Sequence, residues 1–184
     1  AMDAGIDVDH ILLSSTHNHE GPDTLGQWGK QIGESGYNAA YMSEVRSQVV
    51  ASVAEAVDAL VPATLSVAEA DSAEYDPAKG TRSVVYDHRD PKIVDRLVKT
   101  AWLQDMDGQT IATVVNFGNH PEALASANTL VSSDYVDATR RGVEEGIVYP
   151  DSTIAGVGGV CVYLSASVGG MMSPLRVEVT DGSG

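Results

Sequence analysis

Two apolar, strand-like runs of this chain each lead into a histidine and then into a turn. The first run, His10 to Leu13, precedes Ser14-Ser15-Thr16-His17-Asn18-His19-Glu20-Gly21-Pro22, and the second, Ile111 to Phe117, precedes Gly118-Asn119-His120-Pro121. Proline cannot continue the hydrogen-bond ladder of a strand, so we expect the second strand to stop at His120. Because binding sites in open α/β sheets gather beyond the carboxyl ends of strands, this pattern predicts a site that contains histidines.

His17 and His19 are one residue apart at the end of the first run. Alternate residues of a strand point to the same side, so a strand from His10 to Ser15 would direct both rings into one pocket. Imidazole is the commonest nitrogen ligand of zinc and also the commonest general base. The alternative is that these side chains are structural and only satisfy nearby backbone groups.

The remaining pattern predicts strands that alternate with long helices. Expected strands are Ala63 to Ala70, Leu97 to Gln104, Thr110 to Phe117 and Val160 to Leu164, and expected helices are Tyr37 to Leu60 and Asp134 to Glu145, the latter capped by Ser132 or Ser133. Asp107-Gly108 is a strong hairpin signal, which excludes an all-parallel sheet. The predicted fold class is therefore α/β, a layered domain with a mixed β-sheet flanked by helices.

Both ends of the chain look like cuts within secondary structure elements. We therefore expect residues 1–184 to form a single partial domain, an internal segment of a longer catalytic domain. A chain of this length can bury one sizeable core.

Composition excludes several classes of function. The formal net charge is −15 with only 11 Lys and Arg residues, which argues against a nucleic-acid surface and against docking on anionic lipid. No stretch approaches the roughly 20 apolar residues of a membrane span, and no signal peptide is visible. Cys161, the only cysteine, lies in an apolar run, and we expect it to be a buried small hydrophobe. The oligomeric state is left open.

Five segments carry a resemblance to a known family. They are residues 15–22 and 116–121 around the histidines, residues 128–135 (Asn-Thr-Leu-Val-Ser-Ser-Asp-Tyr), Thr81-Arg82-Ser83, and residues 165–174 (Ser-Ala-Ser-Val-Gly-Gly-Met-Met-Ser-Pro). In this order they resemble motifs of the neutral/alkaline, non-lysosomal ceramidases. Asn18 and Glu20 stand where those proteins have Thr and Ser, and Gly170-Met171-Met172 stands for Gly-Asp-Val. We therefore interpret the chain as a divergent, bacterial-type relative.

The resemblance implies a zinc-dependent amidohydrolase of sphingolipid metabolism that cleaves the N-acyl bond of a lipid-like substrate, in a secreted or periplasmic protein. His17 and His120 match the two zinc-binding histidines of the family, whose other ligands, a Glu and a Tyr, come from later in the chain and lie outside this sequence. Zinc–nitrogen bonds of about 2.0–2.1 Å require both rings in one cup. With two ligands missing, we expect this segment alone to bind zinc weakly.

Three further residues match catalytic positions of the family. His19 would border the metal and contact substrate or water, or would simply pack. Arg82 would hold an oxyanion or a carboxylate, or would form a surface ion pair with Asp87 or Asp90. Ser167 aligns with the serine close to the zinc. Counting the alignment differently makes Ser165 the alternative.

Two residues are candidates for substrate binding. Asn119 would hydrogen-bond within the pocket. Glu20 would face the substrate, although it is also placed either to orient a histidine ring or to remain a solvated loop acid. With Asp23 nearby, an anionic rim would favour a neutral or amine-bearing substrate over ceramide.

Two other functions remain open at this stage. The chain could be a relative without catalytic activity that binds a lipid or carbohydrate, or an esterase that uses the same metal site.

Overall fold

The computed structural model describes residues 5–72, 85–87, 89–169 and 172–175. The chain divides into two compact units, and each is described by itself. Unit 1 comprises Ala1–Leu13 with Gly21–Val61, and unit 2 comprises Ser14–Glu20 with Pro62–Gly184. The segment with His17 and His19 therefore belongs to the same unit as His120.

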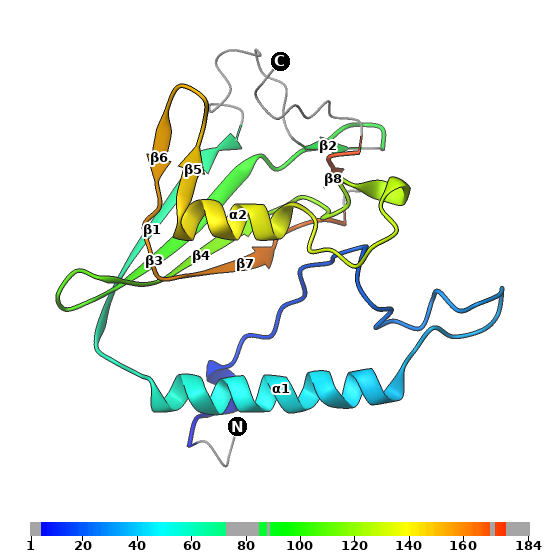
Figure 1. The fold of residues 1–184 in the computed structure, drawn as a ribbon, viewed down its shortest axis with the longest axis horizontal. Helices are drawn as coiled ribbons and strands as arrows, with labels where there is room; N and C mark the ends of the chain where they lie inside the picture. The colour runs from blue at the N-terminus through cyan, green and yellow to red at the C-terminus, as the bar shows by residue number, and fades with distance from the viewer. Residues whose placement is uncertain (1–4, 73–84, 88, 170–171, 176–184) are drawn as a thin grey trace. The chain divides into compact units, whose positions relative to one another are not determined.

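The core of unit 2 is a four-stranded sheet in the order β1-β3-β4-β7 (Figure 1). Its strands are β1 (Ala63–Asp71), β3 (Leu97–Asp105), β4 (Thr110–Phe117) and β7 (Val160–Ser165). The pairs β1–β3 and β3–β4 are antiparallel, whereas β4–β7 is parallel. The predicted mixed α/β fold is confirmed, and each predicted strand of this sheet is present.

The β3–β4 hairpin closes through the predicted Asp-Gly turn. Asp105 Oδ1 accepts hydrogen bonds from the backbone N–H groups of Asp107 (2.9 Å) and Gln109 (2.8 Å). Gly108 adopts a φ of 81°, a conformation that glycine reaches at no steric cost. The turn chemistry alone was therefore enough to predict this hairpin.

The parallel pair β4–β7 places the ends of both strands at one edge of the sheet. In its register Phe117 lies opposite Ser165, the last residue of each strand. Helix α2 (Tyr135–Glu144) lies on the connection between them. It is tied to β7 because Arg140 Nε donates to the Cys161 carbonyl (2.9 Å) and Glu144 Oε1 accepts from the Cys161 N–H (2.7 Å).

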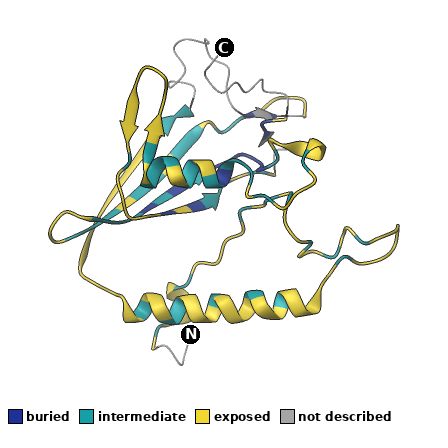
Figure 2. Cartoon of the chain, in the orientation of Figure 1, coloured by how far each residue is buried: buried dark blue, intermediate teal, exposed yellow. Residues whose placement is uncertain are grey.

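One face of the sheet carries the core. Its buried side chains alternate along β4 and β7, as the two-residue period of a strand requires, and comprise Val115, Phe117, Cys161 and Tyr163, with Val85 and Val136 packed among them. The predicted burial of Cys161 is confirmed at 2% exposure. Val67, Val160 and Val162 lie in the same sheet but are exposed. Figure 2 shows exposed, yellow segments along the strands of this sheet.

The strand expected from His10 to Ser15 is absent from the described part of the chain. Val8–His10 instead form a short 3-10 helix, and the next residues are extended but pair with no described strand. Leu12 and Leu13 are 78% and 75% exposed. A β-branched or apolar run forms a strand only where a neighbouring edge and a buried face receive it, and this run has neither. Strand alternation therefore does not bring His17 and His19 to one side, contrary to the expectation from sequence.

Unit 1 consists of a long loop and helix α1 (Ala39–Asp58). The helix begins two residues later than predicted because Asn38 caps it, its Oδ1 accepting from the Tyr41 N–H (3.0 Å). In the loop, the Asp23 carboxylate accepts from the N–H groups of Leu25, Gly26 and Trp28. The Trp28 bond is the main reason that the pKa of Asp23 is lowered. This acid is occupied within its own loop.

Helix α2 is capped by Asp134 rather than by Ser132 or Ser133. Asp134 Oδ1 accepts from the Tyr135 N–H (2.8 Å), whereas Ser132 Oγ accepts from the Asp134 N–H (2.8 Å). The serine therefore fixes the capping residue instead of the helix itself.

The short elements are β2 (Tyr86–Asp87) paired with β8 (Met172–Ser173), β5 (Gly146–Val148) paired with β6 (Thr153–Ala155), and a 3-10 turn at Ala125–Ala127. Neither described helix combines the length and apolarity needed to cross a bilayer.

The buried carboxylate of Asp87 predicts an acid-sensitive step in stability. It accepts from the N–H groups of Ile93 (2.9 Å) and Arg89 (2.8 Å), and these bonds lower its pKa from 3.8 to about 2. A depressed carboxyl pKa stabilises the fold above the unfolded value, and this contribution is lost as the pH falls from about 4 to about 2. Asp87→Asn should lower the melting temperature at neutral pH and flatten its decline between pH 4 and 2, measured by circular dichroism. Asp151→Asn, at an exposed turn, is the control, and equal curves for the two variants would contradict the assignment.

Candidate functional site

The segment Ser14–Glu20 is held beside the end of β4 by hydrogen bonds to the loop that follows. Asn18 Nδ2 donates to the Ser132 carbonyl (2.6 Å), and the Ser132 N–H donates to the Glu20 carbonyl (3.2 Å). The His19 N–H donates to the Pro121 carbonyl (3.4 Å). These bonds span more than 100 residues of sequence, and they carry His17 and His19 to His120.

Asn18 and Asn128 complete this attachment with their side chains. Asn18 Oδ1 accepts from the Glu20 N–H (2.6 Å), which closes a tight local turn. Asn128 Nδ2 donates to Glu20 Oε2 (2.8 Å) and to the Leu130 carbonyl (2.8 Å). Asn18, which departs from the family motif, is therefore one of the residues that fix the segment.

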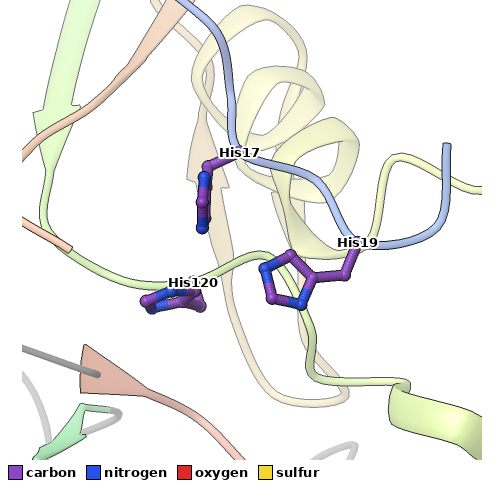
Figure 3. Close-up of side chains that lie close together, drawn as sticks. All are labelled: His17, His19 and His120. Atoms are coloured by element: carbon purple, nitrogen blue, oxygen red, sulfur yellow. The ribbon is translucent and has the colours of Figure 1, made fainter. Parts of the chain in front are cut away.

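Three histidine rings converge at this edge of unit 2 (Figure 3). The ring centroids of His17 and His120 are 4.7 Å apart, those of His17 and His19 are 5.1 Å apart, and those of His19 and His120 are 5.3 Å apart. One nitrogen from each ring lies within 4.8 Å of the others. The structure thus brings together the two predicted metal ligands and adds His19 to them.

His17 reaches the cluster through an uncommon backbone conformation. Its φ is 61°, in the left-handed region that non-glycine residues seldom occupy. Such a conformation costs of order 1–3 kcal/mol and persists where surrounding contacts determine it. Here those contacts are the hydrogen bonds of Asn18 and His19 that follow directly in the chain. The turn at His17 replaces the strand alternation that the sequence indicated.

His120 is buried, at 8% exposure, and its turn is fixed by two tyrosines. The Tyr135 hydroxyl donates to the Asn119 carbonyl (2.7 Å), and the hydroxyls of Tyr135 and Tyr163 are 2.9 Å apart. The Tyr163 hydroxyl also lies 3.2 Å from the Phe117 carbonyl. Burial raises the pKa of both phenols, so they remain neutral hydrogen-bonding groups.

Glu122 is a site residue that the sequence analysis missed. Its Oε2 lies 3.1 Å from His19 Nδ1, and its own N–H donates to the His120 carbonyl (2.9 Å). The carboxylate beside His19 is therefore that of Glu122, whereas Glu20 Oε2 accepts from Asn128 Nδ2. The sequence offered one indication of this role, because Glu122 follows His120 by two residues at the end of a predicted strand.

The electrostatics of the cluster favour a neutral His17. Its pKa is lowered, first by partial desolvation and then by the neighbouring His120 and His19, while Glu122 acts in the opposite direction. The side chain keeps an exposed surface, so the desolvation is incomplete. A neutral imidazole has the free lone pair that a metal ligand needs.

A pocket of about 570 Å³ opens beside the cluster. His19, Glu20 and Glu122 form a polar part of its wall, and Ala125, Leu130, Val131 and Leu175 supply apolar surface. The volume falls in the range of small-molecule sites, which combine apolar walls with a few polar groups.

The remaining predicted site residues lie at different places. Arg82 is outside the described residues. Ser167 is exposed in the turn after β7, at the sheet edge that also ends in His120. The Ser165 Oγ is buried with no partner among the described residues. The Asn119 side chain is buried at 3% exposure, which leaves little area for contact with a substrate.

The donor set fits zinc. Three imidazole nitrogens are a known ligand set for a catalytic zinc with one open position, and a carboxylate behind one of them is a usual companion. Two ligands of a tetrahedral zinc lie about 3.3 Å apart, given bonds of about 2.0–2.1 Å. The three histidine nitrogens lie within 4.8 Å of one another, which is a wider spacing than a bound zinc would require.

Comparison with known proteins gives a likeness of fold. No protein-family model and no curated protein sequence matches the chain. Among solved structures, neutral ceramidase from Pseudomonas aeruginosa aligns with a TM-score of 0.60 and 19% identity over 80% of this chain. A ceramidase complexed with C2 aligns with a TM-score of 0.63 and 17% identity over 88% of it. The chain spans 23% and 25% of the lengths of those two proteins.

Removing the Tyr135 hydroxyl should disturb the histidine turn. Tyr135→Phe leaves the Asn119 carbonyl without the 2.7 Å bond and the Tyr163 hydroxyl without its neighbour. An unsatisfied buried group costs about 1–3 kcal/mol, so the free energy of unfolding should fall by about that amount in urea titrations. Tyr149→Phe, at a partly exposed ring in the β5–β6 turn, should change it by less than about 0.5 kcal/mol. Equal effects would show that the pair does not support the turn.

Proposed function

We propose that this chain carries the metal-binding part of a zinc-dependent hydrolase that cleaves an N-acyl bond in a lipid-like substrate. The observation that carries the proposal is the convergence of His17, His19 and His120 beside a partly apolar pocket. The likeness of fold to two ceramidases supports it. So does the placement of the cluster beyond the carboxyl end of β4, where sites of α/β sheets gather.

In the proposed mechanism, His17 and His120 would hold the metal. A zinc ion there would act as a Lewis acid on the scissile carbonyl and would lower the pKa of water to about 7. The buried, tyrosine-fixed turn keeps His120 in position. Partial burial and then the neighbouring His120 and His19 lower the pKa of His17, which favours the neutral ring that a metal ligand needs.

Other residues would position the substrate and the developing charge. Arg82 would support the oxyanion of the tetrahedral intermediate, together with backbone N–H groups of the glycine turn at Gly169. Ser167 is proposed as the serine that meets the substrate, because it is exposed whereas the Ser165 Oγ is buried. Asn119 would act through its backbone, since its carbonyl fixes the turn that bears His120.

The pocket suits an acyl or alkyl chain with a polar attachment. Leu130, Val131 and Leu175 offer an apolar wall, and Glu20 and Glu122 bring negative charge near His19. Such a rim disfavours an anionic headgroup and tolerates a neutral or cationic one.

The two alternative functions differ from the proposed one in the substrates that the protein would hydrolyse. A binding protein without catalysis would turn over neither amide nor ester. An esterase would hydrolyse acyl esters and leave the matching N-acyl amides intact. A panel of N-acyl and O-acyl compounds with the same chains, assayed with the full-length protein, separates the three cases.

His120→Ala should abolish zinc binding and turnover without unfolding the sheet. His120 lies beyond the last residue of β4, so its removal takes away a ligand but no ladder hydrogen bond. Zinc content by mass spectrometry, N-acyl turnover and far-ultraviolet circular dichroism would be measured in the full-length protein. His10→Ala, an exposed histidine of unit 1, is the control. Normal turnover with stoichiometric zinc in His120→Ala would contradict the proposed ligand.

Glu20→Gln should change substrate preference. The amide preserves an acceptor for Asn128 Nδ2 but removes the charge. We expect kcat/KM for an amine-bearing N-acyl substrate to fall roughly two- to fivefold, the scale of a partly exposed ion pair, with little change for a neutral short-chain N-acyl compound. Ceramide should be a poor substrate of the wild type. Glu145→Gln is the control. A wild type that favours ceramide, or a Glu20→Gln variant that loses activity equally on both substrates, would contradict this specificity.

A further inference from the structure

The pocket beside the histidine cluster has one wall residue from a distant part of the chain. Its other described lining residues lie within 19–20 and 122–131, whereas Leu175 follows strand β8 (Figure 1). We infer that Asp87 is a positioning residue for this wall, because its buried side chain holds β2 in the pairing with β8 that places Leu175. The inference rests on the proposed function for what occupies the pocket, and it assigns a role to a residue outside the histidine cluster.

The Asp87 carboxylate is bonded to the backbone that follows β2. Its Oδ1 accepts from the Arg89 N–H (2.8 Å) and from Arg89 Nε (3.4 Å), and its Oδ2 accepts from the Ile93 N–H (2.9 Å). The residue has 0% exposure. These bonds, first that from Ile93, lower its pKa to about 2, so both oxygens are acceptors at neutral pH. The side chain therefore ties the end of β2 to the segment that leads into β3.

Both ends of this tied segment are packed on the core of the sheet. Val85, directly before β2, is 3% exposed and belongs to the buried cluster, and Val94, directly after Ile93, packs against the same cluster. A segment that is packed at both ends and closed by a buried, hydrogen-bonded carboxylate is held rigidly. Strand β2 is therefore a fixed edge in the described part of unit 2.

Strand β8 depends on this edge. Among the described strands it pairs with β2 alone, with Tyr86 opposite Ser173 and Asp87 opposite Met172. Ser173 is 1% exposed, and its Oγ accepts from the Leu175 N–H (3.2 Å). An isolated two-stranded ribbon is marginal at best in water, so a ladder this short needs an anchored partner. The position of Leu175 is thus set by a turn that begins at the buried end of the ladder.

Leu175 is the part of the pocket wall that this linkage controls. It is 41% exposed and lines the pocket with Leu130 and Val131, which belong to the loop after β4. The histidine cluster is held by other hydrogen bonds, those of Asn18 and of Tyr135. A displacement of β8 would therefore remove apolar contact from a bound chain and leave the cluster in place. Asp87 should accordingly affect the binding of long chains rather than the chemical step.

The first test measures binding in the absence of turnover. Octylamine joins an alkyl chain to an ammonium group, which is the chemistry that the pocket favours, and titration calorimetry on the full-length protein gives its dissociation constant. The variants are Asp87→Asn, Leu175→Ala and the double variant. Asp151→Asn and Leu60→Ala, at exposed positions, are the matched controls. Thermal melts establish that each variant is folded at the assay temperature.

We expect Leu175→Ala to weaken octylamine binding about tenfold and Asp87→Asn about three- to tenfold, because both remove apolar contact with the alkyl chain. The double variant should bind like Leu175→Ala within about twofold, since Asp87 acts through a side chain that is already gone. A purely structural role of Asp87 would make the two effects multiply. The controls should stay within about twofold of the wild type.

Turnover gives the second readout. For an N-octanoyl amine we expect Asp87→Asn to raise KM about three- to tenfold with kcat unchanged, and for the N-acetyl form of the same amine we expect no change in either. A loss of folded protein alone would lower kcat on both substrates and leave both KM values as they are. Ser173→Ala removes the acceptor of the Leu175 N–H without altering the Asp87 carboxylate, and it should show the same split.

The two readouts distinguish the inference from the proposed function. If the wild type hydrolyses N-acyl amines while Asp87→Asn and Ser173→Ala keep its KM on both substrates, the positioning role is wrong and the proposed function stands. If the linkage to Leu175 is found in octylamine binding but no N-acyl compound is hydrolysed, Asp87 positions the wall and the proposed function is wrong.

Three further results would overturn the inference. One is a wild type that binds no octylamine, and another is a pair of effects for Asp87→Asn and Leu175→Ala that multiply. The third applies where Asp87→Asn does not fold, because Ser173→Ala then decides alone. Wild-type affinity for octylamine in Ser173→Ala would show that the ladder does not place Leu175, whereas weakened binding that is not additive with Leu175→Ala would support the inference.

Discussion

The candidate site depends on the hydrogen bonds between the segment Ser14–Glu20 and the loop that follows β4. Asn18 and Glu20 bond Ser132 and Asn128, and His19 bonds the Pro121 carbonyl. Without this attachment His17 and His19 would lie on a chain with no strand partner among the described residues. Each bond contributes only about 1 kcal/mol net, but several acting on consecutive residues hold a backbone with a positive φ at His17.

The other half of the site depends on the parallel pairing of β4 with β7. Because the two strands run in the same direction, the turns after Phe117 and Ser165 leave the sheet at the same edge. Helix α2 then places Tyr135 where its hydroxyl reaches the Asn119 carbonyl, and Tyr163 of β7 completes the contact. The position of His120 is therefore a consequence of the core packing, whereas the positions of His17 and His19 are a consequence of loop hydrogen bonds.

The two halves of the site differ in the burial of their histidines. The sheet and its core provide a rigid support on which His120 and Glu122 sit. His17 and His19 keep exposed surface, and His19 Nδ1 lies 3.1 Å from Glu122 Oε2. These one buried and two exposed histidines form a group that could hold a metal ion, with ring nitrogens that lie within 4.8 Å of one another.

The sequence by itself determined the mixed sheet, both long helices, the Asp-Gly hairpin, the burial of Cys161 and the stop of β4 before His120. These features follow from local periodicity and turn chemistry, which act over a few residues. The same local evidence failed for residues 10–15, because an apolar run becomes a strand only if a neighbouring edge pairs with it. The tertiary structure decided the turn at His17, the capping of α2 by Asp134, and the contact between Glu122 and His19. Each of these is set by groups that are far apart in the chain or by side-chain geometry within a loop, and no period or spacing in the sequence encodes that geometry.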